Sequence, residues 1–335
     1  MKKTCLVIVF LTVSILGNMN SFAAKTVNDS IPNPVWGIFS PLYFSGGNGY
    51  HTPQKDWPWK KLNLIIISFA HVYPANSDTD FKHIVPGTAS NVQSAYVLGY
   101  ENARNNWKDV KPPSKGDFDV DRIKKIVDMA KNSETGNSST KFLISLGWGS
   151  NDDWTKISTD LTSGANKFPD SVVKYITTNN LDGFDIDWET PNGTITQENF
   201  TKVCQNIRIA LDSQGQKDGK LYIFSITPAE YTSLTETNLK YFDLINPQSY
   251  YGNGADYVNN LTGDTYKVSE DNITLGMSIE SDDDLSVKAM NTLKNLFIDN
   301  DLRGLYIWNM GDDEMNNFKY INEFLNKKTI PTVPK

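Results

Sequence analysis

The sequence predicts an α/β fold in which eight parallel strands close into a barrel with helices around it. Short apolar runs recur eight times between residues 35 and 308, and amphipathic helical patterns fall between several of them. Strands that alternate with helices in this way over ~300 residues are typical of a TIM, or (β/α)8, barrel. An open, doubly wound sheet is the alternative, but the G-x-G-x-x-G spacing of a phosphate-binding loop is absent after the first run.

The predicted strands are short segments rich in apolar and β-branched residues. Such near-continuous apolar runs are expected where a parallel strand is buried on both faces. They cover residues 35–39, 62–70, 141–147, 181–189, 221–227, 242–250, 273–279 and 304–308.

Apolar residues at i, i+3, i+4 and i+7 predict four amphipathic helices. These patterns lie within residues 123–130, 200–211, 287–297 and 321–325. Cys204 belongs to the second apolar stripe, so we expect it to pack in the core rather than to react.

The N-terminus resembles a secretory signal over residues 1–23. Lys2 and Lys3 precede an apolar run that is too short to span a bilayer, and small residues precede a cleavage point after Ala23. We then expect an N-terminal linker over 24–34, one catalytic barrel over 35–326 and a polar tail over 327–335. The predicted protein is secreted, either to a periplasm or outside the cell, without membrane insertion.

The chain is acidic, with a formal net charge of −7. Cleavage of the leader would remove two lysines and leave −9. This charge argues against nucleic acid and against anionic membrane surfaces as partners. Cys204 would then be the only cysteine, so no intrachain disulfide is expected; a chain of this length buries enough surface to fold without one.

Residues 181–189 carry three acids at alternate positions, which is the period of a strand. Asp185, Asp187 and Glu189 should therefore share one face, with neighbours roughly 6.6 Å apart at a rise of about 3.3 Å per residue. The residues that should face the opposite way, into apolar surroundings, are Phe184, Ile186 and Trp188.

Carboxyl groups this close together disfavour joint ionisation, so at least one pKa should rise. A carboxyl group that keeps its proton near neutral pH can act as a general acid. Glu189 has the longest side chain and stands last on the strand, so it is the expected proton donor. Asp187 is its expected partner, and Asp185, the deepest acid, should share a proton with Asp187.

Two other interpretations of the acidic run are weaker. Carboxylates also bind Ca²⁺ or Mg²⁺, but calcium loops usually contain Gly and Asn and wrap around the ion, whereas bulky apolar residues interrupt this run. A solvated edge strand would leave the alternate apolar residues exposed. We therefore expect neither a metal nor another cofactor.

The run 181–189 resembles the active-site strand of family 18 glycoside hydrolases, which include chitinases and endo-β-N-acetylglucosaminidases. The resemblance extends over most of 35–326. Residues 145–149 are similar to the Ser-x-Gly-Gly motif of the third strand, with Trp148 in place of one glycine, where its side chain is expected to line the cleft and bind substrate. Residues 243–250 are similar to the sixth-strand segment; many members have Met-x-Tyr there, and this chain has the variant Gln248-Ser249-Tyr250, which other branches of the family use.

The same resemblance assigns aromatic residues to the sugar site. Trp308 matches the eighth-strand tryptophan that forms the floor of the −1 subsite, and Phe39 and Phe69 match aromatic positions at its base. Packing in the barrel core is the alternative role for each of these side chains. In a TIM barrel the chemistry lies at the carboxyl ends of the strands, where Glu189, Gln248, Tyr250 and Trp308 are all expected.

A retaining glycosidase usually places a second carboxylate about 5 Å from the acid, across the scissile bond. Acids on one strand do not suit that arrangement, and family 18 enzymes use the substrate as nucleophile instead. The resemblance then implies that Glu189 protonates the leaving oxygen and later deprotonates water. Asp187 would stabilise the 2-acetamido group, with Asp185 behind it and Tyr250 fixing the carbonyl.

The short connection between 279 and 304 leaves no room for the α+β insertion of many processive chitinases, which predicts an open cleft. The expected partner is a carbohydrate containing N-acetylglucosamine, such as chitin or chitooligosaccharides, bound by a monomer. Cleavage of the chitobiose core of N-glycans and sugar binding without catalysis are the alternatives.

The long segment 73–113 is expected to be a loop that shapes the cleft. Its residues His83, Tyr96, Tyr100 and Trp107 include aromatics that could stack on sugars or pin the loop to the barrel.

Overall fold

A computed structural model describes residues 31–41, 54–74, 96–100, 119–147, 151–189, 194–250, 253–279, 285–315 and 317–325. The predicted signal, most of the predicted linker and the predicted tail lie outside these ranges. Trp148, His83 and Trp107 also lie outside them, so the expectations placed on these residues stay predictions.

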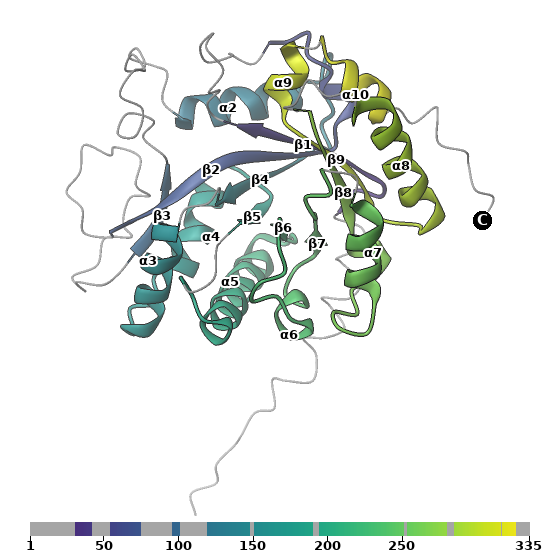
Figure 1. The fold of residues 1–335 in the computed structure, drawn as a ribbon. Coiled ribbons are helices and arrows are strands. Elements are labelled where there is room, and N and C mark those ends of the chain that lie inside the picture. The colour runs from purple at the N-terminus through teal and green to yellow at the C-terminus, as the bar shows by residue number, and fades with distance from the viewer. Residues whose placement is uncertain are drawn as a thin grey trace, which may run out of the picture.

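Eight parallel strands form a nearly closed barrel, as predicted (Figure 1). The spatial order is β7-β6-β5-β4-β2-β1-β9-β8, and a single parallel bridge between Ile245 and Ile273 joins the two ends. The strands are β1 (Val35–Pro41), β2 (Leu64–Pro74), β4 (Lys141–Leu146), β5 (Gly183–Trp188), β6 (Ile223–Pro228), β7 (Leu244–Ile245), β8 (Thr274–Ser278) and β9 (Gly304–Trp308).

One strand, β3 (Tyr96–Tyr100), was predicted as part of a loop. It pairs antiparallel with the outer half of β2, from Ala70 opposite Tyr100 to Pro74 opposite Tyr96. β2 is 11 residues long and extends beyond the barrel, where its edge provides this pairing partner. The expectation of a loop over this segment is therefore wrong at β3: Tyr96 and Tyr100 belong to a strand.

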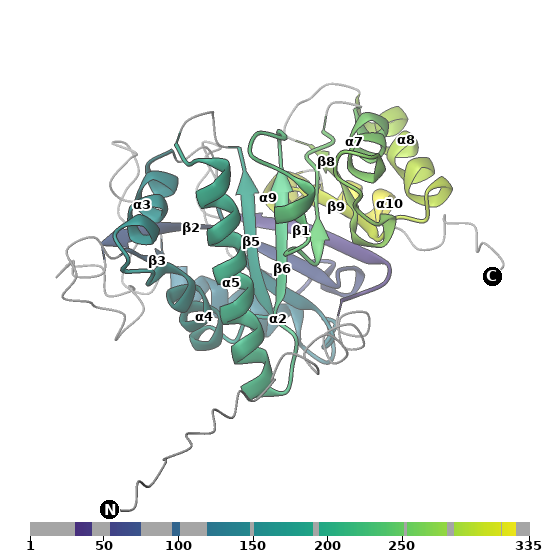
Figure 2. The same ribbon diagram turned by 90° about the horizontal axis from the view of Figure 1, so that it is seen from below.

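Helices surround the strands (Figures 1 and 2). They are α2 (Asp119–Ala130), α3 (Asn151–Thr162), α4 (Phe168–Thr178), α5 (Gln197–Asp218), α6 (Glu236–Leu239), α7 (Gly254–Thr262), α8 (Leu285–Asp299), α9 (Met310–Met315) and α10 (Lys319–Phe324), with 3-10 turns η2 (Trp59–Lys61) and η3 (Glu270–Asn272). The four predicted helices are α2, α5, α8 and α10. Among the described residues, no helix combines the length and apolarity that a membrane span requires.

The connection from β8 to β9 contains α8 and, over its described residues, no further domain. The prediction of a barrel without an α+β insertion at this point is thus confirmed there. Some helices were missed because they are polar. α3, for example, is rich in Asp, Ser and Thr, which favour caps and turns over helix interiors and obscure its apolar stripe.

The longest helix, α5, has clear start and stop signals. The Thr196 hydroxyl caps its first turn by accepting the Asn199 N–H at 3.2 Å, and Gly219 ends it with a left-handed φ of 65°. Its apolar stripe packs against β5, where the rings of Phe200 and Trp188 lie 4.2 Å apart. Figure 2 shows α5 lying along β5 and β6, which fixes the strand that carries the acids.

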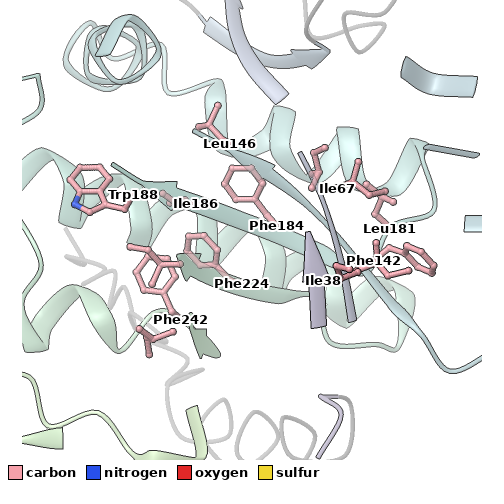
Figure 3. Packing of buried hydrophobic residues seen from close by; sticks show 14 of the residues in the cluster. Ile38, Ile67, Phe142, Leu146, Leu181, Phe184, Ile186, Trp188, Phe224 and Phe242 are labelled. Carbon is pink, nitrogen blue, oxygen red and sulfur yellow. The ribbon is translucent and has the colours of Figure 1, made fainter. Parts of the chain in front are cut away.

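The core has two layers. An outer layer fills the space between strands and helices, and Figure 3 shows Phe184, Ile186 and Trp188 of β5 within it. An inner layer fills the barrel and includes Phe39 and Tyr306. The alternation predicted for β5 is confirmed, because its apolar residues face the helices while Asp185 and Asp187 face the barrel interior.

Candidate active site

The acids of β5 lie at three depths. Asp185 is fully buried, Asp187 is buried at 3% exposure, and Glu189, which follows the last residue of the strand, is partly exposed. Neighbouring strands place their own side chains beside them, with Ser145 of β4 and Ser225 of β6 both in register with Asp185. The site therefore runs from the barrel interior to its carboxyl end.

Three hydroxyl groups surround the carboxylate of Asp185. Ser145 Oγ donates to Oδ2 at 2.6 Å, and Ser225 Oγ and Thr227 Oγ1 donate to Oδ1 at 2.5 and 3.1 Å. Burial raises the pKa of Asp185 to about 6, although these donors favour the charged form. The predicted rise of one pKa is confirmed here, but its largest cause is burial rather than repulsion between neighbouring acids.

A chain of hydrogen bonds reaches Asp185 across the barrel. Thr274 Oγ1 of β8 donates to Asn246 Oδ1 at 2.5 Å, and Asn246 Nδ2 donates to Thr227 Oγ1 at 3.3 Å. Thr227 in turn donates to Asp185. Because all donors point the same way, each bond polarises the next and all of them support negative charge at Asp185.

One amide joins the two outer acids. Nε2 of Gln248 donates to Asp187 Oδ1 at 2.8 Å and to Glu189 Oε1 at 2.7 Å. The backbone N–H of Gln248 donates to the Pro228 carbonyl at 2.9 Å, which fixes the residue to the end of β6. Gln248 thus bridges the two acids, with one hydrogen bond to each carboxylate. The sequence did not suggest this role.

The end of β4 passes directly over Asp187. Gly147 has a φ of +154°, and a Cβ atom there would lie 2.2 Å from the Asp187 carbonyl oxygen. Only glycine allows this close approach. Residues 145–147 therefore support the acids in two ways. The Ser145 hydroxyl donates to Asp185, and the absence of a side chain at Gly147 leaves room for the backbone of Asp187.

Aromatic rings form one side of the site. Trp308, at the end of β9, is partly exposed, and its ring lies 5.3 Å from that of Phe39 and is stacked at 5.8 Å on that of Phe69. Phe39 and Phe69 are buried at 1% and 5% exposure. Of the three, Trp308 offers the accessible ring, while both phenylalanines support it from within the core.

Tyr250 lies beside this aromatic group and is partly exposed. Its hydroxyl is hydrogen-bonded to Tyr306, whose ring centroid lies 6.3 Å away. Burial raises the pKa of Tyr250 well above its usual range, and the negative charges of Asp187 and Glu189 act in the same direction. The phenol therefore stays protonated and remains a hydrogen-bond donor at neutral pH.

The structure brings Asp185, Asp187, Glu189 and Gln248 together through hydrogen bonds, and it groups Trp308, Phe39 and Phe69 separately by ring contacts. The residues that sequence reasoning missed are Ser145, Thr227, Ser225, Asn246, Gly147 and Tyr306. Their sequence signal is that polar residues alternate within otherwise apolar strands, as Ser225 and Thr227 do. Among the described residues, no group of three or more His, Cys, Asp or Glu side chains is arranged to hold a metal ion.

Known proteins share both sequence and architecture with this chain. The profile described as "Glycosyl hydrolases family 18" matches residues 41–279. Chitinase A1 from Niallia circulans is 29% identical over 247 residues, which are 65% of this chain and 34% of that protein.

Solved structures show the same fold at low identity. Chitinase ChiW from Paenibacillus sp. str. FPU-7 has a TM-score of 0.62 at 15% identity over 88% of this chain and 32% of its own. The chitinase-like agglutinin RobpsCRA from Robinia pseudoacacia has a TM-score of 0.59 at 12% identity over 86% of this chain and 98% of its own. The chain thus spans about a third of Chitinase A1 and of ChiW.

Proposed function

The chain belongs to glycosyl hydrolase family 18, and from that premise we propose that it is a secreted retaining glycosidase that hydrolyses β-1,4 linkages between N-acetylglucosamine units. Chitin and chitooligosaccharides are the proposed substrates. The observation that carries the proposal is the Gln248 amide that joins Asp187 to Glu189, because it holds a partly exposed acid beside a buried one.

Glu189 is the proposed general acid and base. It is the outermost acid of β5 and partly exposed, so a glycosidic oxygen can approach it. The carboxylates joined by Gln248 stand at the end of one strand, because Asp187 belongs to β5 and Glu189 follows its last residue. That arrangement suits a proton donor with a helper better than it suits an acid with a nucleophile across the bond.

The proposed nucleophile is the carbonyl oxygen of the substrate's own 2-acetamido group. It attacks the anomeric carbon while the bond to the leaving oxygen breaks, and that oxygen takes the proton of Glu189. Water then attacks the same carbon, gives its proton to Glu189 and opens the cyclic intermediate. Two displacements at one carbon leave its configuration unchanged.

Asp187 is the proposed partner of the acetamido N–H, which becomes positively charged in the intermediate. Asp185 lies beneath it, and its pKa of about 6 allows it to hold a proton or release it near neutral pH. The hydroxyl of Tyr250, which is bonded to Tyr306 in the free protein, is the proposed donor to the acetamido carbonyl once the sugar is bound, and the partly exposed ring of Trp308 is the proposed floor under the sugar.

Cleavage of the chitobiose core of N-glycans remains a second candidate. One observation favours it. The described residues between β8 and β9 contain α8 and no added domain, so the site is not enclosed by such a domain on that side. Sugar binding without catalysis is a third candidate, since a chitinase-like agglutinin shares the fold. The presence of Glu189 beside Asp187 argues for turnover over binding alone.

Turnover on two substrates tests the proposal. Wild type, Glu189→Gln and a control, Glu236→Gln, would be incubated with chitotetraose and with a glycoprotein that carries intact N-glycans. Glu236 is an exposed acid paired with Lys267 on the surface. We expect cleavage of chitotetraose by wild type and control and a loss of about 10³-fold or more in Glu189→Gln.

Release of glycans that leaves one N-acetylglucosamine on the protein would instead establish the second candidate. Sugar binding without cleavage of either substrate would establish the third. Export is tested separately, by N-terminal sequencing of the protein recovered outside the cytoplasm, which should begin at Ala24.

A further inference from the structure

The segment that follows β7 carries Gln248 and Tyr250, yet it has little strand pairing. β7 itself contains two residues, Leu244 and Ile245. Toward β6, the N–H groups of Asn246 and Gln248 donate to Ile226 and Pro228 at 2.8 and 2.9 Å. Toward β8, the backbone pairing consists of the bridge at Ile245, and the Ser249 hydroxyl adds two side-chain bonds to Gly276, donating to its carbonyl at 2.8 Å and accepting its N–H at 3.0 Å.

Two prolines interrupt the ladder at this point. A parallel ladder would continue with the N–H of residue 228 donating to the Asn246 carbonyl, but Pro228 has no N–H. Pro247 likewise has no N–H to offer to β8. The carbonyl group of Asn246, a buried residue, therefore needs a donor from elsewhere, whereas the Pro247 carbonyl already accepts the N–H of Ser249 at 2.8 Å.

Tyr306 supplies that donor from β9. Its buried hydroxyl lies 3.0 Å from the Asn246 carbonyl oxygen and 3.0 Å from that of Pro247, so both share its proton. To reach them the ring crosses over β8 at Gly276, where a Cβ atom would lie 2.2 Å from Cζ and 2.3 Å from the hydroxyl oxygen. The missing side chain at Gly276 is thus a condition for this contact.

The same hydroxyl also contacts Tyr250. Tyr306 is hydrogen-bonded to Tyr250, and the two rings meet edge to face. One oxygen atom therefore touches the backbone just before Gln248 and the side chain just after it.

We propose that Tyr306 is a positioning residue of the active site, whose hydroxyl holds residues 246–250 where Gln248 joins the two acids and Tyr250 faces the substrate. This inference rests on the proposed function. Tyr306 acts through Gln248 and Tyr250 and need not touch the sugar itself.

The direct test is Tyr306→Phe, with Tyr222→Phe as the matched control. Tyr222 also loses a hydrogen bond, from its hydroxyl to Asp218 at 2.7 Å, but that bond lies at the far end of α5 from the acids. We expect Tyr306→Phe to lower kcat on chitotetraose by about 10- to 100-fold, with a much smaller change in KM, because small displacements of catalytic groups have effects of this size. The control should keep wild-type kcat.

A general loss of stability would not reproduce two further results. First, Tyr306→Phe should add little to the loss in kcat caused by Gln248→Leu, since both changes disturb the same contact. Second, Pro228→Ala should partly restore kcat in the Tyr306→Phe background, because it returns an N–H that can donate to the Asn246 carbonyl.

Wild-type kcat in Tyr306→Phe, or full additivity with Gln248→Leu together with no rescue by Pro228→Ala, would overturn the inference. If the wild type itself fails to cleave the oligomer, the proposed function fails while the inference remains testable. Crystal structures of wild type and Tyr306→Phe then decide it: the inference requires the Gln248 amide to move away from Asp187 and Glu189 in the variant.

Discussion

Gln248 donates a hydrogen bond of 2.7 Å to Glu189, a residue that precedes it by 59 positions. The contact exists because only β6 separates β5 from β7 in the sheet, and the backbone of Gln248 is bonded to the end of β6 at Pro228. The uncharged amide of Gln248 therefore donates to Glu189, the residue to which we assign proton transfer.

Replacing Gln248 with leucine should disable the site without unfolding the barrel. Gln248→Leu keeps the volume but removes the amide that joins Asp187 to Glu189, so we expect kcat on chitooligosaccharides to fall by about 10- to 100-fold. Steady-state kinetics check this. Gln214→Leu is the matched control, because Gln214 also donates to a carboxylate, Asp218 at 2.9 Å, on the exposed surface. Equal activity in both variants would contradict the role of Gln248.

Gly147→Ala should lower stability and turnover far more than Gly164→Ala, although both glycines have a positive φ. A Cβ at Gly147 would lie 2.2 Å from the Asp187 carbonyl oxygen and 2.7 Å from its Cβ. Gly164 has a φ of +78° with no atom within 4 Å of the added Cβ, so Gly164→Ala costs only about 1 kcal/mol of backbone strain. Urea unfolding and turnover of the two variants separate strain from the clash with Asp187. Similar losses in both would argue against the close approach.

Asp185 makes the stability of the folded protein depend on pH. Its pKa rises from 3.8 to about 6 on folding, so between these values the folded state holds a proton that the unfolded state has released. The contribution of Asp185 to stability is therefore fully present below about pH 4 and is lost as pH rises through 6, a change of about 3 kcal/mol from this group. Asp313, whose pKa burial also raises to about 6, acts in the same direction.

The variant Asp185→Asn removes one of these two contributions. Urea unfolding at pH 4, 5, 6 and 7 should show that its free energy of unfolding falls less steeply with pH than that of the wild type. Asp313→Asn serves as the comparison, since Asp313 accepts the N–H groups of Tyr320 and Ile321 and not the hydroxyl groups that surround Asp185. An unchanged slope in Asp185→Asn would mean that its carboxyl group is not protonated in the folded protein near pH 5.

Trp308→Ala should weaken substrate binding. Its ring is the accessible one of the aromatic group and rests on Phe39 and Phe69. Loss of a stacking surface for a sugar should raise KM about ten-fold, which corresponds to ~1.4 kcal/mol. Trp308→Phe should raise KM less than Trp308→Ala, because an aromatic ring remains at that position. Kinetics on chitotetraose test this, and an unchanged KM in Trp308→Ala would assign Trp308 to the core alone.

Much of this architecture could be predicted because it follows from local periodicity. The alternation of acids and apolar residues in 181–189 sets which side chains face the barrel, and the structure agrees. β3 could not be predicted, since five residues form a strand there only because β2 continues beyond the barrel.

The candidate site was predictable only in part for the same reason. Asp185 and Asp187 stand on β5 and Glu189 directly follows it, whereas Ser145 and Ser225 reach Asp185 from 40 residues away on either side. The contact of Tyr306 is less visible still, because it depends on Gly276 for space and on a proline at 228 for an unpaired carbonyl. Such relationships arise from strand register, which no single segment encodes.

The central claim is that Glu189 donates the proton while the substrate supplies the nucleophile. Proton NMR of the first product formed from chitotetraose, recorded for wild type and Glu189→Gln before mutarotation, tests it most directly. We expect the β-anomer from the wild type and a rate of product formation that is lower by about 10³-fold or more in the variant. An α-anomer as first product, or an undiminished rate in Glu189→Gln, would contradict it.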